Sequence, residues 1–155
     1  MMSRNLLILL AAGGSLALLL GAFGIQYIGG LLPCQLCLWQ RWPHAAAVLI
    51  GLLALWLGNR VWPMLGALAA LTSAGIGAFH VGVEQKWWEG LASCTVNAMQ
   101  GVSGSDLLNT EIVVAAPVRC DAIAWQLMGV SMAGWNVILS LALVVIWVMA
   151  ARKPA

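Results

Sequence analysis

The sequence predicts an all-α membrane protein, a bundle of four transmembrane helices with both termini cytoplasmic and a long second outer loop. Of the 155 residues, 63% are hydrophobic and 8% are charged, whereas soluble domains are roughly 45–50% apolar and about 25% charged. Four apolar stretches reach the roughly 17–25 residues that a spanning helix needs. No room remains for a soluble enzyme domain of ordinary size, so any chemistry must take place in the helices or their loops.

The elements follow in order along the chain. The predicted spans and outer loops cover about 6–25, 42–58, 61–83 and 131–150, and about 26–41 and 84–130. The first apolar run is near twenty residues long, which exceeds the ~7–15 of a signal-peptide core, so we interpret it as an uncleaved helix. The second connection is very short, which predicts an antiparallel hairpin. We expect residues 1–155 to form a single membrane domain.

Small residues and tryptophans support this arrangement. Glycines of the first and third spans, among them Gly14, Gly66 and Gly75, allow membrane helices to approach one another closely. Tryptophan collects at the two membrane interfaces. On that basis Trp135 marks the outer interface and Trp147 the inner one.

Charged residues orient the predicted bundle. Basic residues without acidic neighbours lie at the termini or in the tight second connection, and they are Arg4, Arg60, Arg152 and Lys153. Cytoplasmic segments collect this excess of Lys and Arg, so both termini are predicted to be cytoplasmic. All five acidic residues and all four cysteines fall on the other side, in a compartment where disulfides persist. The net charge of +2 carries no nucleic-acid signal, and we expect membrane lipid but no nucleic acid as a partner.

The motif Pro33-Cys34-Gln35-Leu36-Cys37 stands at the outer end of the second span. Two cysteines one helical turn apart can close a reversible disulfide, and such pairs commonly carry thiolates of lowered pKa. A disulfide across two intervening residues restricts little chain entropy, which argues against a purely structural role. Beside a bilayer, the pair can meet a lipid-soluble electron carrier.

Metal and haem sites are the alternative interpretations of this pair. Zinc prefers four ligands, and the side chains that could complete such a set are Cys94, Cys120, His44 and His80. Haem attachment requires a histidine directly after the second cysteine, where Leu38 stands. We therefore favour redox activity over metal binding and expect no metal.

The remaining polar candidates each have two interpretations. Cys94 and Cys120 form either a structural staple or, together with the short pair, a relay of two disulfides on one face of the membrane. Arg41 lies one turn beyond Cys37, where a cation lowers the pKa of a thiolate and can donate to a carbonyl of a bound carrier. Its alternative is an arginine that reaches lipid phosphates. His80 either donates to such a carbonyl or is satisfied in the polar interface.

Taken together, residues along the whole chain form one pattern, which consists of Cys34-Gln35-Leu36-Cys37 followed by Arg41, then Cys94, then Arg119-Cys120-Asp121 with Trp125, Gly129, Met132 and Trp135. This pattern resembles the disulfide bond formation protein B (DsbB) family of bacterial inner-membrane thiol oxidoreductases. The resemblance includes helix count and loop order, and the combination is specific although each piece alone is not.

The resemblance implies a protein dithiol:quinone oxidoreductase of the bacterial inner membrane whose redox cysteines face the periplasm. Its implied partner is a DsbA-like periplasmic thioredoxin-fold oxidase, which the enzyme reoxidises by disulfide relay. Its implied cofactor is a membrane quinone, either ubiquinone or menaquinone, to which the electrons pass. The long second loop is then periplasmic.

The resemblance also implies roles for the four cysteines by position. Cys94 is similar to the cysteine that forms the mixed disulfide with the partner, and Cys120 to its pair, which becomes free and attacks Cys34. Cys37 resembles the thiolate that contacts the quinone.

Three other positions are implied to bind the quinone together with Cys37. Arg41 is similar to the residue that holds both charges in place. His80 and Met132 occupy positions similar to quinone-lining residues of the family.

Three further hypotheses stay open on the sequence alone. The first is a specialised paralogue that serves one dedicated thioredoxin-like partner, suggested by the aromatic residues Trp39 and Trp42 around the motif. The second is a protein like vitamin K epoxide reductase, against which the order of the cysteine pairs counts. The third is a non-catalytic membrane subunit with two structural disulfides.

Overall fold

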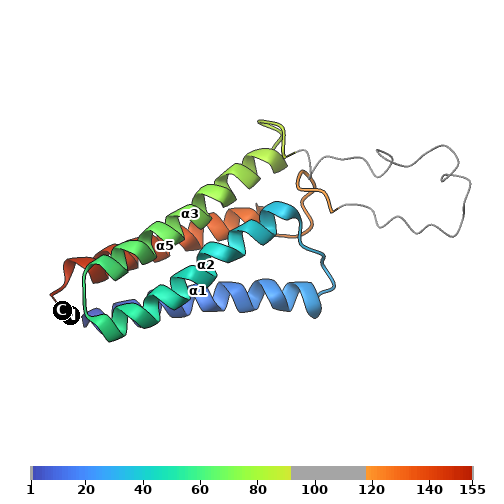
Figure 1. The fold of residues 1–155 in the computed structure, drawn as a ribbon. Helices are drawn as coiled ribbons and strands as arrows, with labels where there is room; N and C mark the ends of the chain where they lie inside the picture. Colours follow the sequence, from blue (N-terminus) through green and yellow to red (C-terminus); the bar gives the residue numbers. More distant parts are fainter. Residues whose placement is uncertain (1, 92–117, 155) are drawn as a thin grey trace, which may run out of the picture.

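The computed structural model describes residues 2–91 and 118–154. Within them the chain is mostly helical. Its elements are α1 (Arg4–Tyr27), α2 (Gln35–Leu57), α3 (Val61–Glu84), β1 (Gln126–Leu127), β2 (Val130–Ser131) and α5 (Met132–Arg152). Both termini lie at one end of the bundle, and the α1–α2 connection lies at the other (Figure 1).

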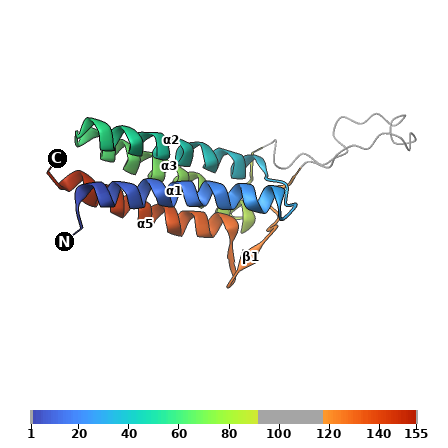
Figure 2. The same cartoon turned by 90° about the horizontal axis from the view of Figure 1, so that it is seen from below.

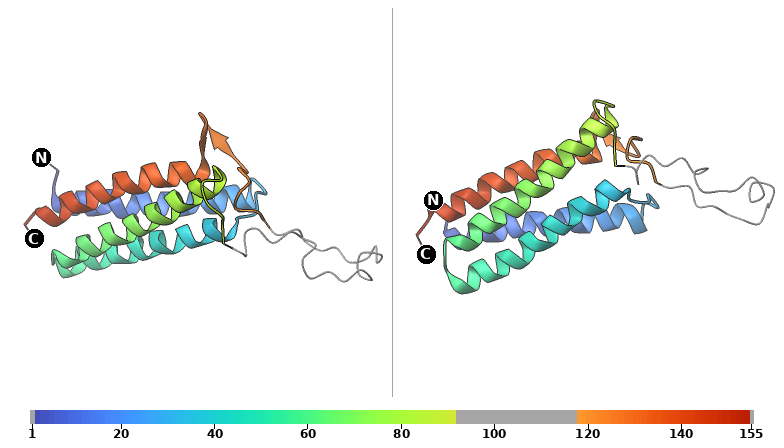
Figure 3. Two further views of the ribbon diagram at one scale, coloured as in Figure 1. Left: turned by 90° about the horizontal axis from the view of Figure 1, so that it is seen from above. Right: turned by 45° about the horizontal axis from the view of Figure 1, so that its top comes forward.

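The four described helices run side by side as a bundle (Figure 2, Figure 3). α3 packs most extensively against α5 and α2, and α1 closes the ring by packing against α2 and α5. Three of them, α1, α3 and α5, are long and apolar enough to cross a membrane. α2 has similar length, but polar residues in its first turns, among them Gln40, Arg41 and His44, lower its hydropathy.

The second helix begins earlier than the sequence predicts, at Gln35 rather than near Trp42. Cys34 is its N-cap residue and has an extended backbone, and its Sγ accepts a hydrogen bond from the Cys37 backbone N–H at 3.3 Å. Such a cap satisfies one of the free N–H groups at a helix start. Cys37 therefore lies in the first turn of α2, and not in an outer loop as we predicted.

The structure adds one short element to the predicted helical fold, because β1 and β2 form a short antiparallel hairpin directly before α5. Met128 and Gly129 between them both have positive φ, 53° and 78°, as a tight two-residue hairpin turn requires. The hairpin leads directly into α5, whose N-cap Ser131 accepts from the Gly134 N–H at 3.1 Å. It thereby sets where the last helix begins.

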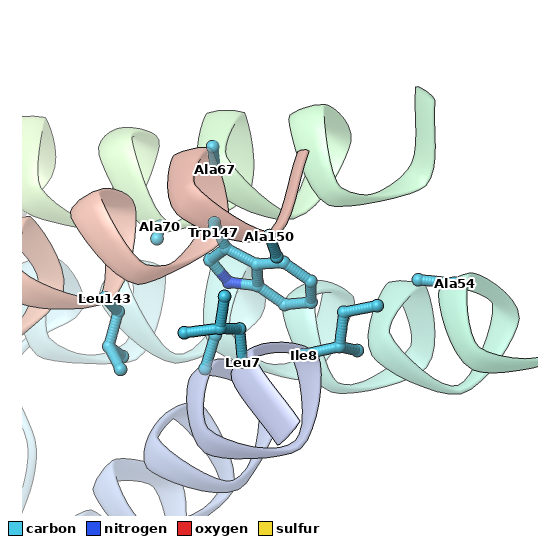
Figure 4. Close-up of a cluster of buried hydrophobic side chains, with 9 residues drawn as sticks. Leu7, Ile8, Ala54, Ala67, Ala70, Leu143, Trp147 and Ala150 are labelled. Atoms are coloured by element: carbon cyan, nitrogen blue, oxygen red, sulfur yellow. The ribbon is translucent and has the colours of Figure 1, made fainter. Parts of the chain in front are cut away.

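Trp147 is fully buried at the end of the bundle that carries the termini. The close-up in Figure 4 shows its indole ring among side chains from all four helices, with Leu7, Ile8 and Ala54 nearby. Gly66 makes room for the ring, because a Cβ at this position would lie 2.6 Å from indole Cε2. The small residues of the core thus accommodate one large side chain.

Replacing Gly66 by alanine will therefore lower the melting temperature of the purified protein in detergent. The added methyl group overpacks the core against Trp147, which typically costs about 1–3 kcal/mol. Gly75→Ala is the matched control, since it changes the same residue type in the same helix and nothing lies within 4 Å of the added Cβ. Equal melting temperatures for the two variants would contradict the packing described.

Candidate active site

The site begins with two sulfur atoms at the start of α2. Cys34 is buried and Cys37 is partly exposed, and both are free cysteines. Their Sγ atoms lie 3.0 Å apart, within hydrogen-bond distance of each other. The structure therefore represents the reduced form of the short cysteine pair.

The surroundings of Cys34 favour its thiolate form. Hydrogen bonds from Cys37 lower the pKa of Cys34 to about 4, although burial opposes the shift. His80 contributes further, since its Nε2 lies 3.6 Å from Cys34 Sγ. A thiolate is the nucleophile in disulfide exchange, so this environment suits Cys34 to that chemistry.

The lowered pKa of Cys34 predicts how the thiolate absorbance of the reduced protein depends on pH. We expect the thiolate absorbance of the reduced protein to persist as the pH falls from 8, and to be lost around pH 4. Because the pKa of Cys34 is lowered to about 4 in the folded protein, its thiolate stabilises the reduced fold fully above the ordinary cysteine pKa. This stabilisation declines below that value and is lost once the pH has fallen through about 4. A single loss near the ordinary cysteine value of ~8.5 would contradict the assignment. The protein with both thiols alkylated is the blank.

Hydrogen bonds fix the orientation of His80 beside the pair. Gln40 donates through Nε2 to the backbone carbonyl of Leu36 at 3.1 Å, which identifies that atom as the amide nitrogen. The same Nε2 lies 3.1 Å from His80 Nδ1, so Nδ1 accepts and the ring proton resides on Nε2. His80 Nε2–H consequently faces the carbonyl of Cys120 at 3.1 Å and the sulfur of Cys34.

The same reasoning extends the polar network deeper into the bundle. Asn136 Nδ2 donates to Gln40 Oε1 at 2.7 Å and to the Ser73 carbonyl at 3.3 Å. Asn136 Oδ1 is therefore the acceptor that lies 3.0 Å from His44 Nε2, so His44 donates from Nε2. A continuous chain of hydrogen bonds thus links the cysteine pair to His44, two turns further along α2.

The proton on His80 Nε2 argues against the alternative of a metal site at the cysteine pair. Cys34, Cys37 and His80 are the one group of potential metal ligands within ligating distance of each other in the described part of the chain. A metal would require the lone pair of His80 Nε2, but Gln40 keeps the proton on that nitrogen. The donor set therefore suits a thiolate stabilised by hydrogen bonds better than a metal ion.

Of the second predicted cysteine pair, the described residues include only Cys120. Cys120 is fully buried and disulfide-bonded, and it shares a buried cluster with Cys34, Leu36 and Val83. Beside it, the exposed Arg119 guanidinium lowers the pKa of Asp121 through a hydrogen-bonded ion pair. Cys94 lies outside the described residues.

A large cavity lies between α1, α2, the β hairpin and α5. It has a volume of about 340 Å³ and mostly apolar walls, within the roughly 300–1,000 Å³ of ligand pockets. Cys37, Arg41 and Met132 line it, as do Trp125 and Trp135. Three of the four predicted quinone-binding residues are thus brought together.

His80 lines a smaller cavity of about 50 Å³ on the side of Cys34, together with Glu84 and Arg119. Cys37, Arg41 and Met132 line this smaller cavity too, so it brings all four predicted quinone-binding residues together. Glu84 Oε1 lies 3.9 Å from His80 Nε2, and Glu84 Oε2 accepts from the Ser131 hydroxyl. His80 therefore contacts the buried sulfur and not the large cavity.

Arg41 is held by α1. Its Nη1 donates to Gln26 Oε1 at 2.5 Å, its Nη2 donates to the Ala22 carbonyl at 3.3 Å, and its guanidinium lies 4.9 Å from the Phe23 ring centroid. Its Nε is buried with no hydrogen-bond partner among the described residues. These contacts hold a positively charged residue at the wall of the large cavity.

The sequence analysis missed Gln40, His44 and Asn136 as parts of one network. Their signal was present, because these are polar side chains at helical spacing in or beside apolar spans. Ionisable and polar residues at membrane depth are usually functional. Which of them meet, however, depends on how α2 and α5 pack.

Comparison with known proteins places the chain in one family. A family model described as "Disulfide bond formation protein DsbB" matches residues 4–150. A curated protein from Acidovorax sp. (strain JS42), named "Disulfide bond formation protein B", is 30% identical over 86% of this chain and 78% of its own. Proteins of the same name from Verminephrobacter eiseniae and Saccharophagus degradans are 34% and 27% identical over 77% and 95% of this chain, and over 70% and 92% of their own. No solved structure matches significantly.

Proposed function

The chain belongs to the disulfide bond formation protein DsbB family, and from this premise we propose that it is a protein dithiol:quinone oxidoreductase of the bacterial inner membrane. In this proposal it reoxidises a DsbA-like periplasmic thioredoxin-fold oxidase and passes the electrons to ubiquinone or menaquinone. One observation carries the proposal. Cys34 is buried in the same cluster as Cys120, and its neighbour Cys37, which packs against that cluster, lines a large apolar cavity.

We propose that α2 is a fourth transmembrane helix. It packs between α1 and α3 along the bundle, and its length of 23 residues matches theirs of 24 and 24. Its polar side chains are satisfied by α3 and α5, as in the bond from Ser73 Oγ to the Gln40 carbonyl, so the membrane would meet mainly apolar residues. Both termini would then lie in the cytoplasm and the cysteines at the periplasmic end.

The first step we propose is disulfide exchange between the two pairs. The partner's dithiol reduces the outer disulfide, Cys94 enters a mixed disulfide, and Cys120 leaves as a thiolate. Cys120 then bonds to Cys34 Sγ and breaks the Cys34–Cys37 bond, so that Cys37 leaves with the electron pair. The shared cluster of Cys120 and Cys34 supports this order.

The partner's second thiol then breaks the mixed disulfide, so that the partner leaves oxidised and Cys94 is freed as a thiolate. Cys94 bonds to Cys120 and displaces Cys34, which leaves Cys34 and Cys37 both reduced. A bound quinone would supply an acceptor of two electrons and two protons in the cavity. The Cys34 thiolate, held by His80, bonds to Cys37 Sγ while two electrons leave the pair toward that cavity. Arg41, which lines the cavity, would place its positive charge near the oxygen on which negative charge develops.

Thiol trapping of the purified protein tests this function. Reduced DsbA-like partner is added, and free thiols are counted with and without quinone. We expect four protein thiols to appear and to disappear again on addition of quinone. Disulfides that stay inert toward the partner would favour a non-catalytic subunit with two structural bridges.

A further inference from the structure

The Nε2 atom of His80 contacts a cysteine from each of the two pairs, the short pair (Cys34 and Cys37) and the outer pair (Cys94 and Cys120). It lies 3.1 Å from the backbone carbonyl of Cys120 and 3.6 Å from the sulfur of Cys34. His80, Cys34 and Cys120 are all buried. One imidazole nitrogen therefore joins the backbone of the outer pair to a sulfur of the short pair.

The proton that makes these contacts is fixed from the other side of the ring. Gln40 Nε2 lies 3.1 Å from His80 Nδ1 and donates to it, so the ring proton stays on His80 Nε2. Gln40 is itself held by the Leu36 carbonyl and by Asn136, whose Nδ2 donates to Gln40 Oε1 at 2.7 Å. Residues of α2 and α5 thus orient a donor that α3 carries.

The described residues place three acceptors around this N–H. The Cys120 carbonyl is the nearest, and the Cys34 sulfur follows. Glu84 Oε1 is more distant, at 3.9 Å, and the other oxygen of that carboxylate already accepts from the Ser131 hydroxyl. The two cysteines are therefore the principal partners of His80 Nε2.

Such contacts suit a reaction between the two pairs. Disulfide exchange depends on the access of one sulfur to another, and fixing two reacting groups side by side removes part of the entropic barrier. We propose that His80 promotes disulfide exchange between the pairs, because its Nε2–H holds Cys120 beside Cys34 and stabilises Cys34 when it leaves as a thiolate. This inference rests on the proposed function.

Each contact acts at its own step. The Cys120 thiolate bonds to Cys34 and breaks the Cys34–Cys37 bond, and the contact with the Cys120 carbonyl keeps the two segments together for this attack. Cys94 then bonds to Cys120 and breaks the Cys34–Cys120 bond, and Cys34 leaves with the electron pair. A stabilised thiolate leaves faster. The structure, with Cys120 in a disulfide and Cys34 free, corresponds to the product of this second step.

A single turnover without quinone separates this exchange from quinone chemistry. The quinone-free protein with both disulfides closed is mixed anaerobically with excess reduced DsbA-like partner, and samples are quenched by acid and alkylated. Mass spectrometry follows the mixed disulfide between the partner and Cys94, and the thiol of Cys37. In His80→Asn we expect the mixed disulfide to form at the parental rate and the Cys37 thiol to appear about tenfold more slowly, as for one lost hydrogen bond.

Two further variants test the role of the donor. His80→Gln is the matched control, because its amide nitrogen extends about as far as imidazole Nε2, whereas asparagine carries the same amide on a side chain one methylene shorter. It should restore most of the parental transfer rate. Gln40→Leu keeps the histidine but removes the donor to its Nδ1, and it should slow transfer to a smaller extent than His80→Asn.

Parental transfer in His80→Asn, or equal slowing in His80→Asn and His80→Gln, would overturn the inference and leave the proposed function standing. If His80→Asn does not fold, parental transfer in Gln40→Leu would overturn it. Failure of the parent protein to form both the mixed disulfide and the Cys37 thiol would instead remove the relay from the proposed function.

Discussion

Serine in place of Cys37 will abolish quinone reduction by the reduced DsbA-like partner. An oxygen atom cannot form a disulfide with Cys34, so the pair can neither accept electrons from Cys120 nor release them toward the cavity that Cys37 lines. The expected rate is that of the uncatalysed reaction, measured as loss of quinone absorbance. Turnover near the parental rate would eliminate the mechanism.

Different trapped species should distinguish the two cysteines of the pair. In Cys37→Ser, the free Cys34 lies in the cluster of Cys120 and should be found joined to it on denaturing gels. In Cys34→Ser, much less of such a species should form, because Cys34 is a buried member of the cluster that holds Cys120, whereas Cys37 only packs against that cluster and also lines the cavity. Leu38→Ser is the matched control, since it introduces the same side chain at an exposed position of the same helical turn and should retain activity.

Arg41→Met will produce the second largest loss, a fall of roughly ten- to 150-fold in kcat/KM for quinone. That range corresponds to about 1.5–3 kcal/mol for a hydrogen bond to a charged group. The variant removes the positive charge of a residue that lines the cavity, together with the bonds to Gln26 and Ala22. Steady-state kinetics with decylubiquinone measure the effect.

The origin of that loss can be resolved with two further variants. Arg60→Met makes the same substitution at the exposed N-terminal cap of α3, where the side chain caps nothing, and should not change the kinetics. Gln26→Leu removes only the partner of Arg41 Nη1 and should cause a smaller loss. If Arg41→Met left kcat/KM unchanged, Arg41 would have no part in binding the quinone.

The membrane character and the helices of the bundle could be predicted from hydropathy, because apolar runs of spanning length have few alternative structures. The residue at which α2 begins could not be predicted. The Sγ of Cys34 caps that helix by accepting a hydrogen bond from the Cys37 backbone N–H, and cysteine is not among the preferred N-cap residues. The buried place of Trp147 depended equally on contacts between helices, above all on the space left by Gly66.

For the candidate site too, local motifs could be predicted from the sequence, whereas contacts between helices could not. Cys34, Cys37, Arg41 and Met132 were identified as candidates from local motif and resemblance, and the structure brings them to one end of the bundle. The place of His80 beside Cys34, and its link to Asn136 through Gln40, join residues from three helices. Only packing decides which polar side chains of different helices meet.

The most direct test of the account counts electrons in one experiment. The purified protein with one equivalent of quinone is mixed anaerobically with reduced DsbA-like partner, and the thiols of Cys34, Cys37, Cys94 and Cys120 are followed by mass spectrometry alongside quinol formation. We predict one quinol for each partner disulfide formed, with Cys34 and Cys37 oxidised last in each cycle. Oxidation of the partner without quinol, or with Cys34 and Cys37 unchanged throughout, would contradict transfer of electrons through this pair.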